Sequence, residues 1–231
     1  MVADFFTNSL FFGVLVSLIG YEIGQFLKKK TGLAIVNPLL IAIVFVIGVL
    51  LLFHIEYETY EAGGIYLNYL LTPATVCLAV PLYKQIHLLK QYGFAIVLSV
   101  LAGTITSLLG VLILSVLFHL DHAMYVTLLP KSITTAIGMG MSEEIGGIVN
   151  ITVAVIVVTG VIGNVIGEWV LNMFRVKDRI AKGLALGTSA HAIGTSKAME
   201  MGEIEGAMSS LAIVVAGLLT VAGASVFSIF Y

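Results

Sequence analysis

The sequence predicts an all-α integral membrane protein, and three observations support this fold class. Of its 231 residues, 59% are hydrophobic and only 10% are charged, against roughly 45–50% and about 25% in ordinary soluble domains. The mean hydropathy is +1.10, so the apolar excess must face lipid rather than water. Several apolar stretches are also long enough to cross a hydrocarbon layer of about 30 Å as helices. We therefore expect one transmembrane domain over residues 1–231 with about six to eight membrane segments.

The expected spans differ in regularity. Five are long and continuous in their hydrophobicity: 5–27, 33–53, 93–118, 147–173 and 206–230. A sixth, 62–88, is also expected to cross but is less regular. Two further stretches, 122–146 and 181–203, are apolar on average yet interrupted by polar residues, Gly and Pro. No basic stretch precedes the first apolar run, so we expect a retained first helix rather than a cleavable signal peptide.

Basic residues indicate the orientation, because cytoplasmic loops collect Lys and Arg. Nine of the eleven basic residues form three clusters: Lys28 to Lys30, Lys84 with Lys90, and Arg175, Lys177, Arg179 and Lys182. If all three clusters are cytoplasmic, the stretches 122–146 and 181–203 must each leave the membrane on the side from which they enter. The alternative is that both cross as broken helices, which places the last cluster outside. We favour the re-entrant arrangement.

Three interrupted stretches resemble one another. They are LLTPATVCLAVPLYKQ from Leu70, LLPKSITTAIGMGMSEEIGGI from Leu128 and GLALGTSAHAIGTSKAMEMGEI from Gly183. Hydroxyl residues coincide at Thr75, Ser132 and Thr188, at offsets of 57 and 56 residues. Between the second and third copies the match continues to the end of the motif. Repeated discontinuous helices are typical of transporters, so we predict an inverted-repeat, transporter-like architecture.

Helix breaks are expected at six Pro and Gly positions: Pro73, Pro81, Pro130, Gly138, Gly187 and Gly194. Lipid cannot pair with the backbone groups that a break frees, so irregular backbone is tolerated only where protein or trapped water satisfies it. Each break therefore predicts the lining of a polar cavity. The alternative is that individual Pro and Gly residues serve packing, as they often do in membrane helices.

Lys131 and His191 are the ionisable residues that we expect within the membrane. A charge near the bilayer centre costs at least about 2.5–3.5 kcal/mol, so such residues are usually functional. Lys131 could attract a carboxylate, and His191 could bind it or carry a coupled proton. Alternatively, Lys131 extends to the interface and His191 hydrogen-bonds a neighbouring carbonyl.

Neutral hydroxyls complete the predicted substrate site. With Lys131 and His191, it comprises Thr75, Ser132, Thr134, Thr135, Thr188, Ser189, Thr195 and Ser196. Each hydroxyl could instead bond to its own helix backbone. Lys197, Glu143, Glu144, Glu200, Glu203 and Glu205 are expected at solvated ends or in ion pairs, and Glu168 is either a proton site or an interfacial residue beside Trp169.

Other functional classes find no support in the sequence. There is no HExxH, GxSxG or CxxC motif and no phosphate-binding glycine loop, so we predict no catalytic residues, metal or cofactor and no enzyme activity. The single cysteine, Cys77, has no partner for an intrachain disulfide. No basic patch interleaved with aromatics indicates nucleic-acid binding.

The three interrupted motifs resemble the signature stretches of the LrgB/CidB family of bacterial membrane proteins. The resemblance covers almost the whole chain, and PKSITT together with HAIGTSKAMEMGE is specific to it. It implies a multi-pass protein of the bacterial cytoplasmic (inner) membrane. It also implies a small LrgA/CidA-like membrane partner and is compatible with a homo-oligomer.

Two functions follow from the resemblance. One is an antiholin-like or holin-like role that modulates murein hydrolase activity and autolysis. The other is transport of small monocarboxylates such as pyruvate, or glycolate and glycerate as in a related plastidal translocator. Matched helix breaks favour transport, because a lytic pore of amphipathic helices has no use for them.

Overall fold

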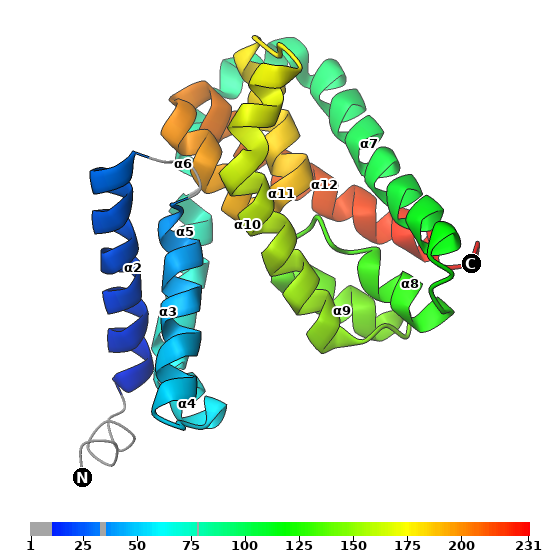
Figure 1. Ribbon diagram of the computed structural model, residues 1–231. Helices are drawn as coiled ribbons and strands as arrows, with labels where there is room; N and C mark the ends of the chain where they lie inside the picture. The colour runs from blue at the N-terminus through cyan, green and yellow to red at the C-terminus, as the bar shows by residue number, and fades with distance from the viewer. Residues whose placement is uncertain (1–10, 33–35, 78) are drawn as a thin grey trace. The chain divides into compact units, whose positions relative to one another are not determined.

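A computed structural model describes residues 11–32, 36–77 and 79–231, and all the regular structure in these ranges is helical. The chain forms two compact units, an N-terminal unit over residues 1–77 and a C-terminal unit over residues 78–231 (Figure 1). The prediction of an all-helical protein is thereby confirmed.

The N-terminal unit contains α2 (Phe12–Thr31), α3 (Pro38–Leu52), α4 (Tyr57–Asn68) and α5 (Leu71–Cys77). Asn37 caps α3, since its side chain accepts hydrogen bonds from the backbone N–H groups of Leu39 (2.8 Å) and Leu40 (3.2 Å). Pro38 follows at the first helical position, where no N–H is needed. A Cβ on Gly24 of α2 would lie 2.6 Å from the Cα of Pro38, so glycine lets α2 and α3 approach closely.

The C-terminal unit contains α6 (Ala79–Lys84), α7 (Ile86–Leu117), α8 (His122–Leu128), α9 (Thr135–Glu144), α10 (Val149–Met173), α11 (Arg179–Met201) and α12 (Glu203–Phe227). Within the described ranges, α7, α10 and α12 are long and apolar enough to cross a membrane, and α3 is a shorter apolar helix. Apolar side chains of α7, α12 and the beginning of α11 form a buried core, with Ile96, Leu184 and Met208 among its members.

The expected span 62–88 is divided among α4, α5, α6 and the start of α7. Pro73 is the third residue of α5, and Pro81 belongs to α6. Proline is tolerated in the first turn of a helix because its missing N–H has no helical partner there. Pro73 therefore lies in the first turn of α5, whereas Pro81 lies within the helical residues 79–84.

Helix α11 is interrupted in its middle by two residues with non-helical backbone, Ala190 (φ −132°, ψ 17°) and His191 (φ 42°, ψ −137°). We call residues 179–189 its first arm and residues 192–201 its second arm. A continuous helix of this length would separate its ends by about 35 Å. Instead, Arg179 at its start donates hydrogen bonds of 2.9 and 3.0 Å to the carboxylate of Glu205, just beyond its end. The two arms therefore fold back on each other.

The segment α8–α9 folds back in a corresponding way. The chain between the two helices, residues 129–134, is not α-helical. Beyond α9, the backbone N–H of Ile148 donates to the hydroxyl of Thr127 at the end of α8 (2.8 Å). Helix α10 contacts both folded segments: α9, which precedes it in the chain, and α11, which follows it (Figure 1).

The 56-residue repeat relates these two folded segments. The non-helical residue Ala190 corresponds to Thr134, the residue that immediately precedes α9. Gly194 corresponds to Gly138, and Leu186 corresponds to Pro130. A Cβ on Gly194 would lie 2.7 Å from the carbonyl oxygen of Leu186. A Cβ on Gly138 would lie 3.6 Å from Cβ of Pro130. Equivalent glycines thus occupy the places where the two halves of each segment meet.

Candidate functional site

The C-terminal unit contains a cavity of about 730 Å³, a volume typical of small-molecule sites. Three segments line it: helix α7, the non-helical chain before α9, and the first arm of α11. Its polar lining residues are Tyr92, Ser99, Thr106, Ser107, Lys131, Ser132, Asp178, Thr188 and Ser189. The second and third interrupted motifs are therefore brought to one cavity, with α7 as a shared wall.

Lys131 supplies the cavity with an ammonium group held by hydroxyls. Its Nζ donates to Oγ of Ser132 (2.9 Å) and to Oγ of Ser107 (3.0 Å), and these two oxygens lie 3.2 Å apart. Within the described part of the chain, no carboxylate lies within ion-pair distance of Lys131. Hydroxyls solvate an ammonium but do not neutralise it, so this group attracts an anion.

Helices α7 and α11 approach each other closely at one point of the cavity lining. A Cβ on Gly103 would lie 2.9 Å from Cγ2 of Thr188 and 3.7 Å from its Cβ. Both residues line the cavity. Because Gly103 has no side chain, the hydroxyl-bearing face of the first arm can approach α7 here.

Asp178 lies where the cavity meets the exposed surface. Its side chain caps α11 by accepting a 2.8 Å hydrogen bond from the backbone N–H of Ala181. The next residue, Arg179, pairs with Glu205, and the hydrogen bonds and charge of that carboxylate raise the pKa of the Arg179 guanidinium. Asp178 thus places a carboxylate at this end of the cavity, and apart from Lys131 the rest of the lining consists of hydroxyl and apolar residues.

His191 does not line the cavity. Its side chain is only 3% exposed, and its Nε2 donates to the backbone carbonyl of Ile156 on α10 (3.0 Å). Its own carbonyl accepts a 2.9 Å hydrogen bond from the hydroxyl of Thr195, which also lies 2.7 Å from Oγ of Ser209 on α12. The interruption in α11 is therefore linked to both neighbouring helices.

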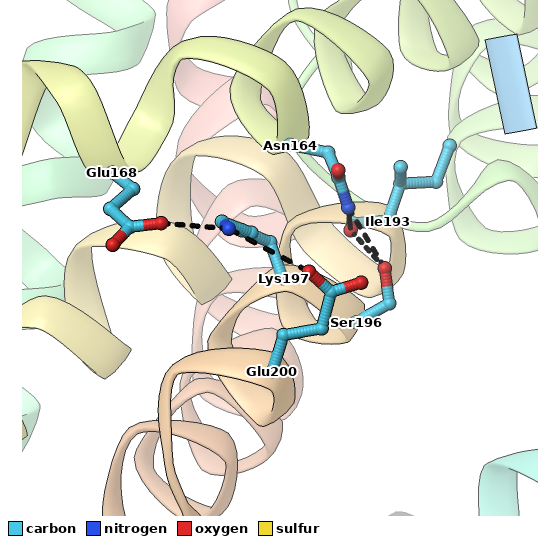
Figure 2. Close-up of polar contacts among 6 residues, drawn as sticks. All are labelled: Asn164, Glu168, Ile193, Ser196, Lys197 and Glu200. Carbon is cyan, nitrogen blue, oxygen red and sulfur yellow. Dashed lines mark hydrogen bonds and ion pairs between the residues drawn. The ribbon is translucent and has the colours of Figure 1, made fainter. Parts of the chain in front are cut away.

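A second set of polar contacts attaches the second arm of α11 to α10 (Figure 2). The side-chain amide of Asn164 donates to the carbonyl of Ile193 (2.7 Å) and to Oγ of Ser196 (2.9 Å). Nζ of Lys197 lies 2.7 Å from a carboxylate oxygen of Glu168 and 3.6 Å from one of Glu200. The ion pairs expected for Lys197 and Glu200 are present, and Glu168 belongs to the same cluster.

The remaining predicted site residues take varied positions. Thr134 and Thr135 begin α9 and do not line the cavity, and Ser196 belongs to the contacts with α10. Pro130 lies in the chain before α9, Gly138 lies within α9, and Gly187 and Gly194 lie in helical turns on either side of the interruption in α11. The side chains of Thr75 and Pro81 lie outside the described part of the structure.

The contribution of α7 to the cavity was not predicted from the sequence. Ser99, Gly103, Thr106 and Ser107 recur at helical spacing and line one wall of the cavity. This periodicity was the available signal, but it lies inside an uninterrupted apolar span. Helix α7 contains no Pro and no polar interruption that would mark it as a discontinuous segment.

Comparison with known proteins identifies the kind of protein to which this fold and cavity belong. Helices able to span a membrane, two folded-back segments and a polar cavity define a helical membrane protein. A model of the LrgB-like family matches residues 17–230, and the chain belongs to this family. The resemblance of its motifs is thereby confirmed. Curated relatives of the chain are described as antiholin-like proteins.

Several curated relatives are similar over nearly their whole length. The chain is 44% identical to the antiholin-like protein LrgB of Bacillus subtilis (strain 168) and 43% identical to those of Bacillus cereus (strain B4264) and Bacillus anthracis (strain CDC 684 / NRRL 3495). Each comparison covers 93% of this chain and 94% of the relative. No solved structure matches the chain.

Proposed function

We propose that this protein is a secondary carrier for small monocarboxylates such as pyruvate, glycolate or glycerate. One observation carries the proposal: Lys131 contributes a cation to a cavity, and within the described ranges hydroxyls rather than carboxylates surround it. A substrate carboxylate would neutralise this charge and accept hydrogen bonds from the ammonium and from Ser107 or Ser132. Because Lys131 is the one cation among the described lining residues, which also include the carboxylate of Asp178, a monoanion suits this lining better than a dianion.

In this proposal the whole chain, 1–231, forms one membrane domain with inverted repeats. The segment α8–α9 enters from outside and α11 enters from the cytoplasm, and each returns to its own side. The folded-back geometry supports this arrangement, since the start of α11 is paired with Glu205 beyond its end. The basic residues Arg175 and Lys177 just before α11 support a cytoplasmic entry for that segment.

Transport then requires that the cavity open alternately to the two sides. Polar backbone at the interruptions is tolerated because it faces protein and the cavity rather than lipid. We propose that α7 and the first arm of α11 separate and approach during this cycle, since they form the two long walls. The second arm stays attached to α10 through Asn164 and Lys197.

Uptake into proteoliposomes tests the proposal. The purified protein is reconstituted, and entry of labelled pyruvate and labelled glycolate is measured over time and concentration. Saturable uptake that decreases when unlabelled monocarboxylates are added as competitors would support a carrier. Vesicles with and without a small LrgA/CidA-like protein would show whether the carrier needs this partner. Absence of uptake under both conditions would reject the proposal.

The alternative function is an antiholin-like modulation of murein hydrolase activity. The observation that favours it is the description of the curated relatives as antiholin-like proteins. Release of a trapped fluorescent dye from the same vesicles distinguishes a pore from a carrier, because a pore passes the dye without regard to carboxylates. If the vesicles show neither uptake nor dye release, the remaining function is a regulatory role through other proteins.

A further inference from the structure

The backbone of His191 has an unusual conformation for its residue type. At φ 42° and ψ −137° it lies outside the regions that residues with a side chain ordinarily adopt, and glycine would enter this conformation more easily. The other non-glycine residues with positive φ in the described ranges, His54, His119 and Arg175, are exposed and lie just beyond helix ends. His191 alone among these four is buried. A strained residue in such a place indicates a role for its side chain.

The imidazole of His191 is held by α10. Besides the hydrogen bond to the carbonyl of Ile156, it packs on Gly160, where a Cβ would lie 2.7 Å from Cε1 and 2.8 Å from Nε2 of the ring. Gly163 similarly provides room for the side chain of Ala190. Two glycines of α10 therefore accommodate the two residues that interrupt α11.

The backbone of His191 is connected in the other direction to α12. Its carbonyl accepts the hydroxyl of Thr195, which shares a hydrogen bond with Ser209. The interruption is thus fixed against two helices, and only two residues separate it from Thr188, which meets Gly103 in the cavity. A change at His191 would be transmitted directly to the end of the first arm.

We infer that His191 is a positioning residue of the cavity: its imidazole, bound to Ile156 and seated on Gly160, sets the place where the first arm of α11 presents Thr188 and Ser189 opposite α7. The residue does not touch the substrate. The consequence for uptake rests on the proposed carrier function, whereas the placement of the arm can be measured without it.

The experiment measures the placement of the first arm by cysteine labelling. Cys77 is the only cysteine of the chain and is exposed, so Cys77→Ser provides a cysteine-free background. Ser189→Cys is then added as a reporter on the cavity wall, and its rate of reaction with a small maleimide is determined in reconstituted vesicles. His191→Gly is compared with the parent. This substitution relieves the backbone strain and removes the imidazole.

We expect His191→Gly to change the labelling rate of Cys at 189 and to raise the KM for pyruvate by about two- to tenfold, the factor that one buried hydrogen bond contributes. His191→Gln, which retains a donor of similar reach, should restore part of both properties. His119→Gly is the matched control, because it relieves a positive φ of 51° at an exposed histidine of the same unit. We expect this control to leave labelling and KM unchanged.

A second route avoids dependence on the stability of the His191→Gly protein. Gly160→Ala places a methyl group against the imidazole and against the flexible end of Ile193, so it should shift the labelling rate in the same direction. In the His191→Gly background the same substitution should add little, because the ring is gone and the remaining contact is with the flexible end of Ile193. Unchanged labelling in both single variants, or additive effects in the double variant, would overturn the inference. Failure of the parent to transport would reject the carrier function and leave the labelling test intact.

Discussion

The guanidinium of Arg179 and the carboxylate of Glu205 form a two-point pair that joins the start of α11 to the start of α12. Both hydrogen bonds are short, 2.9 and 3.0 Å, and the geometry is the parallel one that Arg and carboxylates favour. The pair fixes the point at which α11 has returned to its own beginning. The two partners differ in their exposure to solvent, since the Arg179 side chain is 54% exposed and that of Glu205 only 7%.

This asymmetry predicts unequal effects of removing each partner. Arg179→Gln leaves a buried carboxylate without its cation, which is costly, whereas Glu205→Gln leaves a guanidinium that water can solvate. We expect Arg179→Gln to lower the midpoint of thermal unfolding in detergent more than Glu205→Gln does. Size-exclusion chromatography after heating measures this midpoint. Equal losses would indicate that the pair contributes little beyond its surface charge.

The carrier proposal predicts that Lys131 determines substrate affinity. Lys131→Gln removes the charge but keeps a donor, and we expect kcat/KM for pyruvate uptake to fall by about 10- to 150-fold, the worth of a hydrogen bond to a charged group. Lys90→Gln is the control, since Lys90 is an exposed lysine of α7 that does not line the cavity. Normal uptake kinetics for Lys131→Gln would place the substrate carboxylate elsewhere.

The contact between Gly103 and Thr188 predicts a limit on substrate size. Gly103→Ala directs a methyl group at Cγ2 of Thr188, so the cavity narrows and longer monocarboxylates should compete less well for pyruvate uptake. Thr188→Ser removes Cγ2 and leaves a contact of ordinary length, 3.7 Å. The double variant should therefore regain the competition profile of the parent. If neither substitution changes the competition profile, the contact between Gly103 and Thr188 does not limit the size of the substrate.

Glycines at the meeting points of the folded segments predict graded effects on stability. Gly194→Ala places a Cβ 2.7 Å from a backbone oxygen, which cannot easily move, and we expect a loss of about 1–3 kcal/mol in the free energy of unfolding. Gly138→Ala meets the flexible end of Ile156 and should cost less.

Gly140 of α9 provides the control for this series, because nothing lies within 4 Å of a Cβ placed there. Gly140→Ala should be neutral or stabilising by up to about 1 kcal/mol, the difference in helix propensity. Denaturant unfolding followed by the fluorescence of Trp169, the single tryptophan, measures all three variants. Equal losses at Gly138 and Gly194, or a loss at Gly140, would contradict this account.

Some structural features were predictable from the sequence because they depend on local chemistry. Apolar runs of helical length predicted α7, α10 and α12, and Asn37 before Pro38 is a recognisable helix start. The 56-residue repeat also anticipated that the second and third motifs are interrupted at equivalent positions. The specific residues at the interruption were harder to predict, since Gly187 and Gly194 are helical and the non-helical backbone occurs at Ala190 and His191.

The sequence by itself determined the family, the helical membrane class and the presence of polar, interrupted segments, because composition, periodicity and motif are properties of the chain read in order. Only the tertiary structure decided which polar residues share a cavity. Ser107 faces Lys131, and His191 faces Ile156, because of how α7, α10 and α11 pack. These two contacts join residues 24 and 35 positions apart, and the packing of helices that sets them depends on many side chains at once.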